Sequence, residues 1–133
     1  MTLFDDTKPE PPRKIGRYFL ALIFIVLLSI AGYYLLHNYP EEKAVKHFLT
    51  TLQQGNYQEA YKLWQPAPSY TYQDFLHDWG PEGDYGKIRN FDVLGSQSKG
   101  SQTVIVTVRI NGQQPALKLL VDRKTKGLAY NVF

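Results

Sequence analysis

Hydrophobic residues follow three patterns along this chain, and the first is a continuous apolar run. Residues 18–36 read YFLALIFIVLLSIAGYYLL and contain no charged side chain. About 20 apolar residues, at a rise of ~1.5 Å each, cross a ~30 Å hydrocarbon layer as one helix. Because aromatic residues also stand at both ends of the run, as in an interfacial belt, residues 18–36 are predicted to form a transmembrane helix.

Positive charge next to this run indicates its orientation. Arg13, Lys14 and Arg17 precede the run, and no comparable basic cluster follows it. Basic residues favour the cytoplasmic side of a membrane. Residues 1–17 are therefore predicted to be a cytoplasmic tail, and residues 37–133 are predicted to lie outside the cytoplasm. The predicted membrane is a bacterial-type inner membrane. The polar, proline-rich tail is predicted to be disordered.

A cleaved signal peptide is the alternative to an anchor. Ser29-Ile30-Ala31 supplies small residues where a peptidase could cut after Ala31. The apolar run nevertheless continues to Leu36, beyond the 7–15 residues of a typical signal core, which favours the uncleaved anchor.

The second pattern is a helical period after Pro40. Three segments repeat apolar residues every three or four positions, and each begins with a helix start signal, at Pro40, Asn56 and Thr71. The apolar positions are Ala44, Val45, Phe48, Leu49 and Leu52, then Tyr57, Ala60, Tyr61 and Trp64, then Tyr72, Phe75, Leu76 and Trp79.

The third pattern is a strict alternation, strongest at Val104, Val106, Val108 and Ile110. Further strands are predicted from Phe91, from Leu117 and over residues 128–133, with turns at Ser98-Lys99-Gly100 and Asn111-Gly112. The chain is therefore predicted to be α+β, with a transmembrane helix followed by three short helices packed on a four-stranded antiparallel meander sheet.

Composition narrows the classes of function. The chain has no cysteine, which excludes disulfides and thiolate zinc sites, and residues 37–133 are enough for one small domain. Its net charge is +3, but four basic residues belong to the tail, so no nucleic-acid partner is expected.

Charge is uneven between the two halves of the predicted domain. Residues 37–86 are rich in acids and residues 87–133 in bases. Packing of the two halves against each other explains this asymmetry, and we favour that interpretation. The alternative is a basic sheet face, marked by Arg109 and Lys118, that meets an acidic partner or anionic lipid.

Candidate chemistry is sparse. Asp74 and Asp78, with His77 beside them, stand one helical turn apart, but a solvated polar face explains them better than a cation site. Ser96 to Lys99 has the Ser-x-x-Lys spacing of penicillin-recognising hydrolases, but it falls in a predicted hairpin turn. We therefore predict no catalytic residue, no metal site and no cofactor.

The segment between residues 69 and 86 is the strongest candidate for binding. Tyr72, Phe75 and Trp79 are assigned to the core by their helical spacing. Tyr and Trp on a glycine-rich loop are typical of interaction surfaces. The four residues with no assigned core role, Tyr70, Glu82, Asp84 and Tyr85, are predicted to form an interaction loop.

Two resemblances add expectations. Residues 44–64 (AVKHFLTTLQQGNYQEAYKLW) resemble the first helical hairpin of small bacterial nuclear-transport-factor-2-like domains, which implies a cone-shaped pocket. Enzymes of that group place Asp, His and Tyr side chains inside the cone for proton transfer. The resemblance implies that such side chains would come here from Tyr61, Tyr70, Tyr72, His77 and Asp78. The short connection at residues 65–71 leaves no room for the early strands of larger members. A membrane helix followed by helices and this meander also resembles, in outline, cytochrome oxidase assembly factors with one anchor.

The sequence thus predicts a non-catalytic accessory or assembly subunit that docks on another membrane protein or complex. The alternative is a module that binds a small or lipid-like ligand in a cone, and an enzyme is the third possibility.

Overall fold

The structure is a computed structural model that describes residue 9 and residues 14–132 of the chain. It divides into two units, a long N-terminal helix and a domain that begins at His37. The predicted tail lies outside the described residues, except for Pro9 and residues 14–17.

Helix α1 (Lys14–Leu36) is long and apolar enough to cross a membrane, judged by its length and composition. Its 23 residues correspond to about 35 Å at 1.5 Å per residue, and none of them is buried. The polar Ser29 hydroxyl donates to the carbonyl of Ile25 at 2.8 Å, which satisfies it within the helix. The helix begins four residues before the predicted start, so the prediction of disorder is wrong for residues 14–17.

The three short helices of the domain start where the sequence predicts. The Asn56 side chain accepts from the Glu59 N–H, and Thr71 forms a capping box with Asp74. Gly55, at φ +77°, lies in the left-handed region that glycine tolerates and separates the first two helices. The helices are α2 (Tyr39–Gln53), α3 (Tyr57–Trp64) and α4 (Tyr72–Trp79).

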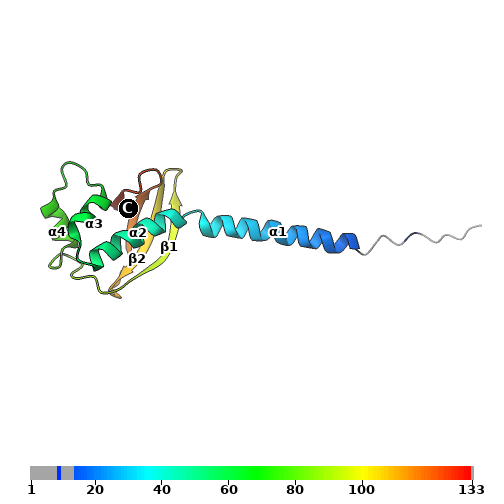
Figure 1. Ribbon diagram of the computed structural model, residues 1–133, viewed down its shortest axis with the longest axis horizontal. Helices are drawn as coiled ribbons and strands as arrows, with labels where there is room; N and C mark the ends of the chain where they lie inside the picture. The colour runs from blue at the N-terminus through cyan, green and yellow to red at the C-terminus, as the bar shows by residue number, and fades with distance from the viewer. Residues whose placement is uncertain (1–8, 10–13, 133) are drawn as a thin grey trace, which may run out of the picture. The chain divides into compact units, whose positions relative to one another are not determined.

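The sheet is antiparallel, in the order β1-β2-β3-β4, so the predicted α+β fold with a meander is confirmed (Figure 1). The predicted turn at Ser98-Lys99-Gly100 is placed too early, because β1 extends through Lys99 and the turn covers residues 100–102. The closing strand ends at Tyr130, before the predicted end at Phe133. The strands are β1 (Phe91–Lys99), β2 (Thr103–Ile110), β3 (Leu117–Asp122) and β4 (Leu128–Tyr130).

The core lies between α2 and one face of the sheet, and it is rich in aromatic rings. Phe48, with no exposed surface, contacts three rings: Trp64 at 5.4 Å, Phe75 at 6.2 Å and Trp79 at 5.1 Å between ring centroids. The alternating residues Val104, Val106, Val108 and Ile110 close this core from β2. Large rings therefore occupy the interior where a cone-shaped pocket was implied.

Candidate functional site at the end of α4

A half-buried carboxylate lies at the C-terminal end of α4. The Tyr70 hydroxyl donates to Asp78 Oδ2 at 2.5 Å, and the Tyr130 hydroxyl donates to the same oxygen at 3.3 Å. These groups come from three elements: the segment before α4, α4 itself, and β4. The sequence predicts a solvated polar face for Asp78, but only 24% of its side chain is exposed.

Burial and the neighbouring carboxylate keep both hydroxyls protonated. Burial raises the pKa of Tyr70, and the hydrogen bond to Asp78 raises it further. Burial also raises the pKa of Tyr130, with added repulsion from Tyr70 and Asp78. The two phenols therefore act as hydrogen-bond donors to Asp78 at neutral pH.

A stack of aromatic rings on the core side of Asp78 supports the site. Trp79 stacks on Tyr85 at 4.7 Å and on Tyr130 at 5.9 Å between ring centroids, the latter pair with an interplanar angle of 4°. Tyr130 thus contributes its ring to the core and its hydroxyl to Asp78. Because Trp79 is almost fully buried, this stack gives the loop that follows α4 a rigid support.

The loop at residues 80–86 is held tightly against the end of α4. The Asp84 N–H donates to the His77 carbonyl at 3.1 Å. A Cβ at Gly83 would lie 2.7 Å from the His77 carbonyl oxygen and 2.8 Å from that of Asp78, so only glycine fits there. The loop therefore returns along the helix and brings Asp84 beside the His77 and Asp78 side chains.

The outer surface of this region is acidic. Glu82 and Asp84 are exposed, and no hydrogen bond or ion pair involves their carboxylates within the part of the chain that the structure describes. Beside Glu82 is a shallow hollow between α4 and the loop, lined by Gln73, Leu76, His77, Pro81 and Glu82. We call Leu76, His77, Pro81, Glu82 and Asp84 together the α4-loop surface.

The four predicted loop residues do lie at this one end of the domain, but they have two different roles. Tyr70 and Tyr85 are partly buried and pack against the core, so the expectation that they have no core role is wrong. Glu82 and Asp84 are the exposed pair. Sequence reasoning missed Tyr130, although its place two residues after the inward-facing Leu128 put it on the core face.

The pair proposed for a basic sheet face lies on the side of the sheet opposite the buried valines. Arg109 is opposite Asp92 on β1, and Lys118 is opposite Thr107 on β2. The Gln114 amide, turned with its oxygen toward the guanidinium, accepts from Arg109 Nε at 3.1 Å. Arg109 therefore has neighbours that satisfy it, and Lys118 is the exposed member of the pair.

The Ser-x-x-Lys segment is also placed by the structure. Ser96 and Lys99 lie in β1, three positions apart, and therefore point to opposite faces of the sheet. Ser96 donates to Glu42 Oε1 at 2.5 Å, whereas Lys99 donates to Asn131. This arrangement differs from the buried helix start at which the hydrolase motif operates.

A second buried carboxylate lies elsewhere in the domain. Glu41, only 2% exposed, accepts from Lys126 Nζ at 2.9 Å and forms an ion pair with Arg123 at 3.6 Å. Arg123 also donates to Asn38 at 2.9 Å and to Ser98 at 2.8 Å. The turn between β3 and β4 thereby holds the first turn of α2.

Comparison with protein-family models, curated proteins and solved structures found no match for this chain. The resemblances to nuclear-transport-factor-2-like domains and to oxidase assembly factors therefore stay predictions.

Proposed function

We propose that this chain is a single-pass membrane accessory protein that docks on a membrane-protein partner through the α4-loop surface. In this proposal α1 is the uncleaved anchor, the N-terminus is cytoplasmic, and residues 37–133 lie on the other side of the inner membrane. The basic residues before the helix support this orientation. The domain acts by binding, without catalysis.

The observation that carries the proposal is an exposed acidic pair on a rigid support. Glu82 and Asp84 lie on a loop fixed by the Trp79–Tyr85 stack and by the close packing of Gly83. A surface that is already ordered before binding loses little conformational entropy when a partner attaches. Two carboxylates without an ion pair in the described structure fit a partner with a basic surface.

The aromatic core argues against the ligand-binding alternative. Four buried rings fill the interior, and each contacts at least two of the others: Phe48, Trp64, Phe75 and Trp79. The hollow beside Glu82 and two further surface hollows, one at residues 101–102 and 122–125 and one at residues 85–90 and 111–113, are lined by other residues, mostly polar ones. A ligand large enough to occupy the interior would have to displace rings that stabilise the fold.

Extraction of native membranes in a mild detergent tests the proposal, with the complex separated on a native gel and identified by mass spectrometry. We expect the wild-type chain to migrate with a stoichiometric membrane protein and the Glu82→Lys variant to migrate alone. Glu59→Lys is the matched control, because Glu59 is an exposed acid on α3. It should keep the partner.

Two results would contradict the proposal. Equal retention of the partner by Glu82→Lys and wild type would exclude the α4-loop surface as the docking site. Migration of the wild-type chain alone, with an extractable small molecule, would favour the ligand-binding module instead. A separate measurement of the mass of the membrane-bound chain distinguishes the two forms of the N-terminus. An uncleaved anchor keeps residues 1–31, whereas a chain cut after Ala31 lacks them.

A further inference from the structure

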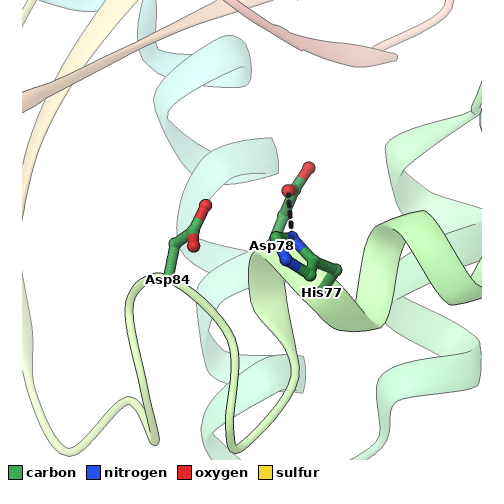
Figure 2. Close-up of side chains that lie close together, drawn as sticks. All are labelled: His77, Asp78 and Asp84. Carbon is green, nitrogen blue, oxygen red and sulfur yellow. Dashed lines mark ion pairs between the residues drawn. The ribbon is translucent and has the colours of Figure 1, made fainter.

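Three metal-ligating side chains meet where the 80–86 loop returns along α4. His77 and Asp78 come from the end of the helix and Asp84 from the loop, and each offers one ligand atom within 4.8 Å of the others (Figure 2). We propose that this His77–Asp78–Asp84 cluster binds a divalent transition-metal cation of the Zn²⁺ class. The inference does not rest on the docking proposal, although His77 and Asp84 also belong to the α4-loop surface.

The spacing of the donors is close to what such a cation requires. His77 Nδ1 lies 3.7 Å from Asp78 Oδ1. Two ligands at bonds of ~2.0–2.1 Å in a tetrahedral site are about 3.3 Å apart, so this pair needs a shift of only a few tenths of an ångström. The Asp84 side chain is exposed and can rotate to complete the set, and water would take the fourth position.

Asp78 is already oriented as a metal ligand would be. Both tyrosine hydroxyls, from Tyr70 and Tyr130, donate to Oδ2, whereas Oδ1 faces His77. Metal-binding carboxylates typically have such outer hydrogen bonds, which fix the carboxylate and leave the other oxygen for the cation. The sequence pairing of Asp74 with Asp78 did not reveal this, because Asp74 is used in the cap of α4.

The charge balance of the cluster also favours a cation. Asp78 and Asp84 bring two carboxylates together, and the Asp78 ion pair in the described structure is with His77 alone, at 3.7 Å. The neighbouring acid Asp74, one helical turn before Asp78, adds further negative charge. An imidazole nitrogen among the donors favours zinc-like ions over Mg²⁺ and Ca²⁺, which prefer oxygen ligands alone.

Isothermal titration with ZnCl₂ tests this inference. The full-length chain would be purified in detergent without a polyhistidine tag and freed of metal with a chelator. We expect one Zn²⁺ per chain and affinity at least ten-fold weaker in His77→Ala. Tyr70→Phe should weaken binding about ten-fold, the usual effect of losing an outer hydrogen bond.

His47→Ala is the matched control, because His47 is an exposed histidine on α2. It should bind zinc as wild type does. Glu82→Lys lies outside the donor set and should also keep its zinc, which separates this result from the docking test. Thermal unfolding of each variant, followed by tryptophan fluorescence, confirms that the domain is folded.

The inference is wrong if wild type binds no zinc at micromolar concentrations. It is also wrong if His77→Ala and Asp84→Asn bind zinc like wild type, since the bound ion would then be adventitious.

Discussion

Two of the buried or partly buried carboxylates of the domain, Glu41 and Asp78, have surroundings that differ in kind. Glu41 is paired with the cations of Arg123 and Lys126, so its charge is balanced inside the fold. Asp78 accepts hydrogen bonds from two neutral hydroxyls, and the exposed Asp84 lies beside it. Neutral donors stabilise a carboxylate but leave its charge uncompensated.

This difference separates a structural cluster from a candidate binding site. The partners of Glu41 are used within the domain, since Arg123 also binds Asn38 and Ser98. At the α4 end the negative charge faces solvent, where a basic partner or a cation can balance it. Unbalanced charge on an ordered support favours binding at the α4 end.

Loss of the Glu41 charge should have the largest effect on the stability of the domain. Glu41→Gln removes both ion pairs and leaves two cations close together, so we expect a loss of about 3 kcal/mol in the free energy of unfolding. Urea unfolding followed by tryptophan fluorescence measures it, since both tryptophans are buried in the domain. Glu59→Gln, at an exposed position, should change stability by less than ~0.5 kcal/mol. An equal loss of stability in Glu41→Gln and Glu59→Gln would contradict a structural role for the buried Glu41 ion pairs.

Removal of the tyrosine hydroxyls that donate to Asp78 should reduce stability less than Glu41→Gln does. Tyr70→Phe deletes the 2.5 Å hydrogen bond to a charged acceptor, for an expected loss of about 1.5 kcal/mol. Tyr130→Phe, with a 3.3 Å contact, should cost about 0.5 kcal/mol. Tyr72→Phe is the control, because Tyr72 packs against Tyr61 through its ring. A cost for Tyr72→Phe as large as for Tyr70→Phe would contradict a specific role for the hydroxyl.

Alkaline pH should destabilise the domain through the same tyrosines. The folded-state pKa values of Tyr70, Tyr85 and Tyr130 are raised, so their contribution is complete below the unfolded value of about 10 and decreases as pH rises above it. Unfolding midpoints measured from pH 8 to 11 should therefore fall above about pH 10, and the decline should be shallower in Tyr70→Phe. An unchanged slope in that variant would show that Tyr70 titrates normally.

Charge reversal on the exposed loop should have the smallest effect on stability. Glu82→Lys is expected to change the free energy of unfolding by less than ~0.5 kcal/mol, because Glu82 makes no described contact through its carboxylate. Thermal unfolding by circular dichroism measures it. A large loss would give Glu82 a structural role and remove the contrast with Glu41.

The sequence predicted the elements more completely than the site. The alternation in residues 103–110 and the helix caps at Asn56 and Thr71 act locally, over a few residues, so they can be read from one chain. The Asp78 site joins residues 8 and 52 positions apart, and no local pattern encodes that contact. The position of Asp84 depends on how closely Gly83 approaches the α4 carbonyls, which composition alone does not reveal.

The order of the strands has a consequence for synthesis. Each strand pairs with the one made just before it, so the sheet can grow from β1 onward as the chain emerges. Tyr130 lies in β4, the last strand added, and it supplies both a hydroxyl to Asp78 and a ring to Trp79. The surroundings of Asp78 are therefore among the last parts of the domain to be completed. A nascent chain that has emerged only as far as β3 contains Asp78 but lacks the Tyr130 hydroxyl and ring.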